Sequence, residues 1–194
     1  MRLVLASGSP QRAELLDRLG LEFDTVPADI DETRHPGEPP GVYVDRVARE
    51  KVSGRGHRDD LVIAADTAVV HDGHILGKPA HPEEARAMLR RLQGASHEVF
   101  TGLSVALGGD VRSLVDVTEV SMVPMTTEEI ADYVDTGEPM DKAGAYALQG
   151  RGGIYVESVT GSPFTVIGLP IHLLPRLVRQ VGADLERFHR GHSV

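Results

Sequence analysis

From the start of the chain, two hydrophobic patterns alternate. One is a continuous run of apolar residues, as in a buried strand, and the other has apolar residues three and four positions apart, as in a helix. Residues 3–12 predict an apolar strand that breaks on a turn of small residues and passes directly into a helix. Ser9 is the expected N-cap and Pro10 the first helical residue, because proline has no N–H to lose there. The apolar stripe reaches Leu19, and Gly20 is the expected stop. A strand that leads into a helix N-terminus can bind an anion through free backbone N–H groups.

The same periodicities predict the other elements. Strands are expected at residues 21–26, 61–70, 97–107, 111–123, 154–159 and 164–167. Helices are expected at residues 41–53, at 82–92, from Thr126 to near Gly137, and from Leu169-Pro170 to Gly182. Asp72-Gly73 and Gly108-Gly109-Asp110 are hairpin signals, and Thr126 with Glu129 forms a capping box. The run at 61–70 is apolar on both faces, which is typical of a strand in an α/β sheet.

Length and composition narrow the class of protein. At 194 residues the chain suits one domain or two closely joined lobes, and 41% hydrophobic with 25% charged residues is typical of globular proteins. We expect one domain over residues 1–194 with a polar, loosely ordered tail at 183–194. The sequence shows no membrane-length apolar run and no signal-like N-terminus, so we expect a cytoplasmic protein without membrane partners. The absence of cysteine excludes disulfides and thiol chemistry.

Charge limits the partners. Twenty basic and twenty-nine acidic residues give a formal charge of −9, which argues against a general nucleic-acid binder. With 4% aromatic residues and no tryptophan, the chain has little material for stacking bases. An anionic substrate would need a local cluster of cations, with or without a metal ion. The nine histidines show no metal-ligand spacing, and we interpret them as structural or solvated.

Two cations and one carboxylate are candidates for chemistry. Arg12 lies in the first helical turn, where the helix dipole disfavours a positive charge. The same positive charge would stabilise a phosphate bound at the helix N-terminus. Lys51 falls on the inward face of its helix, as a snorkelling side chain or as a cation that points at an anion. Asp66 interrupts a buried apolar strand, which is costly unless the carboxylate is paired or metal-bound. The position of Asp66 therefore favours a role as metal ligand or general base. For Arg12, the alternative of a solvated surface residue at an ordinary strand-to-helix turn stays open.

Two further stretches leave alternatives open, and a third adds a cation. Asp29, Asp31 and Glu32 form either a polar turn or an oxygen-rich site for Mg²⁺. Lys78 adds a cation after the hairpin. Residues 137–150 are rich in glycine and other small residues, either to let backbone approach a ligand or to pack tightly.

Taken in order, the motifs resemble the Maf family of nucleoside triphosphate pyrophosphatases, once described as septum-formation inhibitors. The matching motifs are Ser7-Gly-Ser-Pro-Gln-Arg12, Arg49-Glu-Lys51, Ala65-Asp-Thr67, Gly77-Lys-Pro79, Asp141-Lys-Ala-Gly-Ala-Tyr146, Gln149-Gly150 and Gly168-Leu-Pro170. The resemblance implies an α/β fold, with a mixed twisted sheet flanked by helices in two lobes around a central cleft. It also implies hydrolysis of a nucleoside triphosphate to the monophosphate and pyrophosphate with Mg²⁺ or Mn²⁺, in proteins that are often homodimers.

The resemblance assigns roles to individual residues. It implies that Asp66 is the proton acceptor and, with Glu32, holds the metal. Phosphate-binding residues would be Ser7, Arg12, Lys51 and Lys78, with Lys142 elsewhere in the cleft. Thr67 and Gln149 match base-selecting positions of the branch that prefers dTTP and UTP. Gln11 stands where the family usually has a second arginine, so it bears on base preference, and Thr165 stands where asparagine is expected.

Two rival functions remain at this point. One is a nucleotide-binding regulator of cell division with little turnover. The other is a phosphatase that releases orthophosphate from a small metabolite, although no nucleophile motif supports a covalent phosphoenzyme. A regulator has no need of a buried base such as Asp66. The sequence therefore favours the pyrophosphatase.

Overall fold

The computed structural model of the chain describes residues 1–54 and 56–191 and divides into two compact units. Unit 1 contains Met1–Asp66, Thr101–Asp116 and the residues from Gly168 onward, and unit 2 contains Thr67–Phe100 and Val117–Ile167. The strands are β1 (Leu3–Leu5), β2 (Asp24–Thr25), β3 (Leu61–His71), β4 (His74–Leu76), β5 (Ser96–Leu107), β6 (Asp110–Met122) and β7 (Val156–Thr160). The α-helices are α1 (Pro10–Arg18), α2 (Pro40–Val52), α3 (Pro82–Leu92), α4 (Thr127–Asp135), α5 (Pro163–Ile167) and α6 (Leu174–Gln180).

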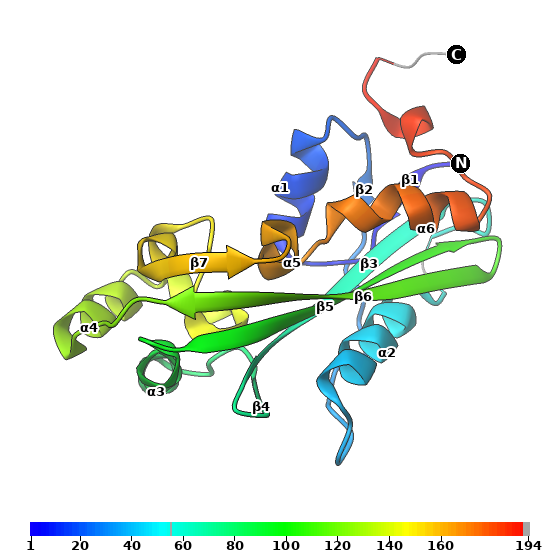
Figure 1. The fold of residues 1–194 in the computed structure, drawn as a ribbon. Helices are drawn as coiled ribbons and strands as arrows, with labels where there is room; N and C mark the ends of the chain where they lie inside the picture. Colours follow the sequence, from blue (N-terminus) through cyan, green and yellow to red (C-terminus); the bar gives the residue numbers. More distant parts are fainter. Residues whose placement is uncertain (55, 192–194) are drawn as a thin grey trace. The chain divides into compact units, whose positions relative to one another are not determined.

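The strands form one mixed seven-stranded sheet in the order β2-β1-β3-β5-β6-β7, with β4 paired to β3 (Figure 1). β1 is parallel to both β2 and β3, whereas β4 pairs with β3, and β7 with β6, in antiparallel fashion. The expected α/β class, with a mixed sheet flanked by helices, is confirmed. The cleft expected between two lobes stays a prediction.

In unit 1 the long helix α2 lies very close to strand β5. A Cβ built on Gly102 would come within 2.3 Å of the Val44 carbonyl oxygen, so only glycine lets the strand approach the helix backbone this closely. Val44, Val47 and Ala48 are fully buried on the inward face, as the spacing predicts. This packing fixes the helix that carries Lys51.

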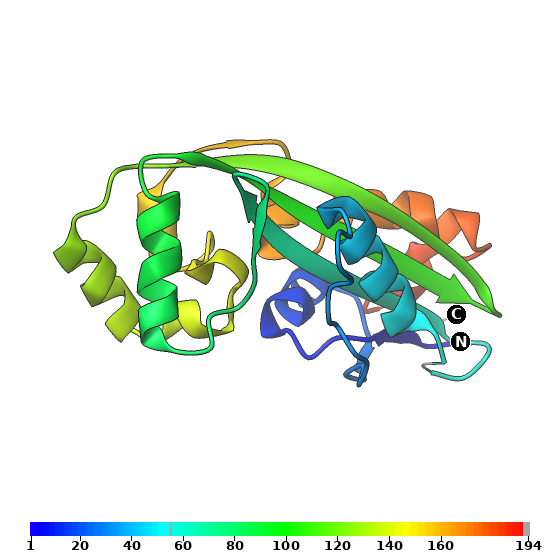
Figure 2. The ribbon, with the colours of Figure 1, turned by 90° about the horizontal axis from the view of Figure 1, so that it is seen from below.

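In unit 2 helices α3 and α4 lie side by side (Figure 2). The predicted capping box is confirmed, with Thr126 accepting from the Glu129 N–H and Glu129 accepting from the Thr126 N–H. The predicted hairpin is also confirmed, since Asp72 and Gly73 have φ of 48° and 73° between β3 and β4. Local sequence signals therefore determine these two features.

Several predicted boundaries are wrong. Residues 164–167 form helix α5 rather than a strand, because Pro163 begins a helical turn that the apolar run continues. The strand expected at 21–26 is reduced to the two residues of β2. The strand expected at 154–159 is shifted to β7, after a 3₁₀ turn over Arg151–Tyr155. The last α-helix begins at Leu174, preceded by a 3₁₀ turn over Ile171–Leu173.

The C-terminal segment is better ordered than expected. Leu185–Phe188 forms a 3₁₀ turn, and the Phe188 side chain is buried. The Glu22 N–H donates to the Phe188 carbonyl (2.7 Å), and the Arg190 N–H donates to the Gly20 carbonyl (2.8 Å). The expectation of a loosely ordered tail is wrong over these residues. The last three residues of the expected tail, 192–194, lie outside the described part of the chain. Among the described residues no helix is long and apolar enough to cross a membrane.

Candidate functional site

The predicted candidates Lys51, Glu32 and Asp66 meet in unit 1. Lys51 lies at the end of α2 and is buried, with its Nζ 2.8 Å from Asp66 Oδ1 and 3.1 Å from Glu32 Oε1. One ammonium group therefore bridges two carboxylates that are 34 positions apart in the sequence. Lys51 faces inward as predicted. Of the two alternatives for its side chain, the contacts support the cation that points at an anion over the snorkelling side chain, and these anions are carboxylates of the protein itself. A contact of Lys51 with phosphate stays a prediction.

Asp66 has the environment of a proton acceptor. The residue is only 6% exposed, and burial raises its pKa although the charge and hydrogen bond of Lys51 oppose the shift. Its Oδ1 accepts from Lys51, whereas its buried Oδ2 has no hydrogen-bond partner among the residues that the structure describes. A buried carboxylate oxygen without a partner is costly, so Oδ2 is an acceptor site that suits a water, a proton or a metal ion.

Ser7 and Arg12 form the second part of the site. The turn after β1 places the Ser7 hydroxyl 3.2 Å from Arg12 Nη1, and the Ser9 N–H donates to the same hydroxyl. Arg12 Nε donates to the Gly168 carbonyl at 2.8 Å, which links the first turn of α1 to the segment before α6. Arg12 is thus held at the helix N-terminus, where an anion is favoured.

The two parts of the site act on each other electrostatically. Burial lowers the pKa of Arg12, while the charges of Asp66 and Glu32 work against that shift. The charge of Arg12 in turn lowers the pKa of Asp66, after the larger effects of burial and Lys51. Two cations and two carboxylates therefore lie in one region of unit 1. A triphosphate bound there could contact the cations in place of the carboxylates.

The donor set fits a hard divalent cation. Mg²⁺ is usually bound in proteins by one or two carboxylates together with substrate phosphates, rather than by a cage of protein ligands. Asp66 and Glu32 supply two carboxylates that both reach Lys51, and Asp66 Oδ2 is an oxygen without a partner in the described residues. The described residues contain no group of three or more acidic or histidine side chains that could hold a metal.

Four further predicted site residues, Thr67, Lys78, Lys142 and Gln149, lie in unit 2. Thr67 follows Asp66 in β3 and is partly buried, whereas Lys78 and Gln149 are exposed. The Lys142 ammonium contacts the Asp141 carboxylate. Burial raises the pKa of Asp141, but the hydrogen bond and charge of Lys142, with the charge of Lys78, outweigh burial, so that the pKa of Asp141 is lowered overall. Both cations thus act on one carboxylate, and their roles toward a substrate stay predictions.

The glycines of residues 137–150 have a structural explanation in unit 2. Gly144 has φ of 71°, its N–H donates to the Gly77 carbonyl, and an added Cβ would come within 2.9 Å of Val69. An added Cβ on Gly150 would come within 2.4 Å of the Glu138 carboxylate. That carboxylate accepts hydrogen bonds from Tyr133 Oη, Arg151 N and Gly152 N. Of the two alternatives, the described contacts support tight packing.

Gln11 and Thr165, the two residues that depart from the pattern of the resemblance, lie in helices α1 and α5. Gln11 lies in the first turn of α1, where its Oε1 accepts from the Ser9 hydroxyl at 2.9 Å. Ser9 stands at the N-cap position as predicted, but its hydroxyl turns to Gln11 rather than to a helix N–H. Thr165 is fully buried in α5. Sequence reasoning gave no role to Gly168, because a backbone carbonyl that anchors Arg12 leaves no trace in residue type.

Comparison with known proteins identifies the family. The family model described as Maf-like protein matches residues 2–181. The chain belongs to the Maf-like protein family. The resemblance drawn from the ordered motifs is therefore confirmed, and the match includes each residue of the site described in unit 1.

Maf-like relatives with assigned activities are similar over nearly their whole length. A dTTP/UTP pyrophosphatase of Anaeromyxobacter dehalogenans (strain 2CP-C) is 53% identical over 95% of this chain and 96% of its own. Those of Myxococcus xanthus (strain DK1622) and Chromobacterium violaceum are 47% and 43% identical, over 94% and 95% of this chain and 94% and 96% of their own. Among solved structures, the Staphylococcus aureus Ham1 protein aligns with a TM-score of 0.43 at 12% identity, over 63% of this chain and 72% of that one.

Proposed function

We propose that this protein hydrolyses a nucleoside triphosphate, with dTTP and UTP as preferred substrates, to the nucleoside monophosphate and pyrophosphate. The observation that carries the proposal is Asp66, a buried carboxylate with one oxygen on Lys51 and the other without a partner in the described residues. The relatives named dTTP/UTP pyrophosphatase, up to 53% identical, support the substrate class. A regulator that only binds nucleotides would not need such a base.

Each residue of the site in unit 1 has its own role in the proposed hydrolysis. Asp66 accepts the proton of the water that attacks the α-phosphorus, and its raised pKa makes it a stronger base than an exposed aspartate. Lys51 holds Asp66 in place and has three N–H donors, so it can also donate to a phosphate oxygen. Arg12 and Ser7 bind further phosphate oxygens at the start of α1. Phosphoryl transfer depends mainly on such positioning and charge neutralisation.

Asp66 and Glu32 would hold Mg²⁺ or Mn²⁺, which supplies Lewis-acid polarisation of a phosphoryl oxygen and neutralises part of the triphosphate charge. Lys78 would add a phosphate contact, and Lys142 a further cation. Thr67, Gln149 and Gln11 select the base, with Gln11 contributing hydrogen bonds but no charge. The cytoplasmic location and the homodimer stay predictions.

The test is the release of pyrophosphate and orthophosphate from dTTP, UTP, CTP and 7-methyl-GTP with Mg²⁺ or Mn²⁺. We expect pyrophosphate from dTTP and UTP, and a loss of at least about 100-fold in Asp66→Asn, which removes the proton acceptor but keeps the side-chain shape. Circular dichroism should show an unchanged fold in that variant. Tight nucleotide binding without pyrophosphate would favour the regulator, and orthophosphate alone would favour the phosphatase.

A further inference from the structure

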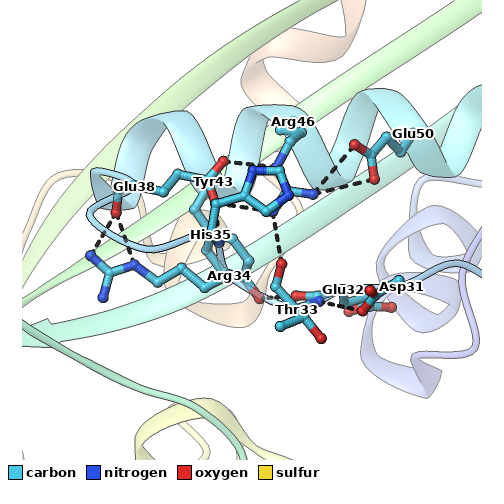
Figure 3. A network of polar contacts seen from close by, with 9 residues as sticks. All are labelled: Asp31, Glu32, Thr33, Arg34, His35, Glu38, Tyr43, Arg46 and Glu50. Carbon is cyan, nitrogen blue, oxygen red and sulfur yellow. Dashed lines mark hydrogen bonds and ion pairs between the residues drawn. The ribbon is translucent and has the colours of Figure 1, made fainter.

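Glu32 belongs to a long segment without regular structure between β2 and α2. The Glu32 side chain is 48% exposed, yet its Oε1 lies 3.1 Å from Lys51 Nζ. A carboxylate in such a loop needs contacts that hold the backbone, because ordering each loop residue costs conformational entropy. Figure 3 shows a network of polar contacts that ties this segment to α2.

Arg46 is at the centre of this network. Its Nε and Nη2 donate to the two carboxylate oxygens of Glu38 at 2.7 and 3.0 Å, which is a bidentate pair. The Arg46 and Glu38 side chains are only 19% and 6% exposed. The Arg46 hydrogen bond is the largest influence on Glu38 and holds the pKa of that carboxyl at about 2. The pair is therefore fully ionised at neutral pH.

The network reaches the residues on either side of the Glu32–Thr33 peptide bond. Arg46 Nη2 also donates to the Thr33 carbonyl at 3.1 Å, and Tyr43 Oη donates to the Glu32 carbonyl at 3.1 Å (Figure 3). Both donors come from α2, the helix that carries Lys51 at its other end. One rigid element thus holds both the backbone of Glu32 and the cation that its side chain contacts.

We propose that Arg46 is a positioning residue that holds Glu32 against Lys51 and Asp66, and so sets the affinity of the site for a divalent cation. Arg46 acts through the loop, since its hydrogen bonds are to Glu38, Glu50 and the Thr33 carbonyl. Its guanidinium also lies 5.8 Å from the centre of the Tyr43 ring. The proposal rests on the proposed function for the role of Glu32 as a metal ligand. Lysine cannot replace Arg46, because one ammonium cannot reproduce the planar two-donor fork on Glu38.

The test is Mn²⁺ binding to the substrate-free protein, measured from water proton relaxation, for wild type, Arg46→Met and Arg46→Lys. Residues that orient metal ligands typically change metal affinity by about 10–100-fold. We expect both variants to bind Mn²⁺ about tenfold more weakly. Turnover should show the same rise in the Mn²⁺ concentration for half-maximal rate, with kcat recovering to within about twofold at saturating Mn²⁺.

A double-mutant cycle with Glu32→Gln separates positioning from a merely structural role. If Arg46 acts through Glu32, adding Arg46→Met to Glu32→Gln should weaken Mn²⁺ binding no further. A purely structural effect would instead weaken binding by the same factor in both backgrounds. Tyr43→Phe, which removes one bond to the Glu32 carbonyl and keeps the ring, should give a smaller loss of affinity in the same direction.

Arg86→Met is the matched control. Arg86 also projects from a helix, is similarly buried at 22% exposure, and pairs with two carboxylates, but it lies in unit 2. Its Mn²⁺ affinity should equal that of the wild type. Equal affinity in wild type and Arg46→Met, or no Mn²⁺ binding by the wild type, would overturn the proposal. Weakened binding in a protein that releases no pyrophosphate would leave the positioning role standing and remove the proposed function.

Discussion

Protonation of His97 should destabilise the fold in mild acid. His97 is 3% exposed in β5, and its Nε2 lies 2.8 Å from Tyr146 Oη, while its Nδ1 has no partner in the described part of the chain. Burial, with a smaller effect of the charge of His71, lowers the pKa of His97 from 6.5 to about 4. The native state therefore resists a proton that the unfolded chain accepts.

The magnitude follows from the two pKa values. Because the pKa is depressed in the folded state, the stabilising contribution is present in full well above pH 6.5 and is lost as the pH falls toward 4. The loss is about 2 kcal/mol between pH 7 and pH 5 and about 3 kcal/mol by pH 4. The sign is opposite to that of Asp66, whose raised pKa favours the folded state at low pH.

Urea unfolding at several pH values, with His97→Gln as the comparison, isolates this effect. Glutamine can still hydrogen-bond to Tyr146 but does not titrate, so the contributions of all other groups cancel in the difference between the two proteins. The stability difference between wild type and variant should move by about 2 kcal/mol in favour of the variant from pH 7 to pH 5. Parallel pH profiles would refute the reasoning.

Two further substitutions test the packing of β5. Gly102→Ala should lower the unfolding free energy by about 3 kcal/mol, because the new Cβ would meet the Val44 backbone and displace α2; unchanged stability in urea unfolding would contradict the close approach. Ser104→Ala should raise it by about 1 kcal/mol, because the buried Ser104 hydroxyl has no partner among the described residues. A clear loss of stability in Ser104→Ala would show that this hydroxyl is satisfied.

Local signals predicted the parts of the fold that depend on neighbouring residues. The Asp72-Gly73 hairpin and the capping box at Thr126 need only a few consecutive residues, and both were predicted correctly. The strand predicted at 164–167 was wrong, because a short β-forming run after Pro163 also fits a single helical turn. Short apolar runs cannot be assigned by period alone.

The site was predictable only in part. A carboxylate within a buried strand marked Asp66, and helical spacing marked Lys51, because both signals lie within one element. The pairing of Lys51 with Glu32 depends on the loop that Arg46 ties to α2, through contacts 13 positions apart in sequence. Such long-range contacts leave no periodic signal, so the role of Arg46 became visible only in three dimensions.

The most direct test of the account is the position of oxygen transfer in H₂¹⁸O. Hydrolysis of dTTP in a single turnover, followed by mass spectrometry of both products, shows which phosphorus the water attacks. The account predicts one ¹⁸O atom in the nucleoside monophosphate and none in pyrophosphate, with both products lost in Asp66→Asn. Label in the pyrophosphate, or normal turnover without the Asp66 carboxylate, would contradict water attack at the α-phosphorus with Asp66 as the base.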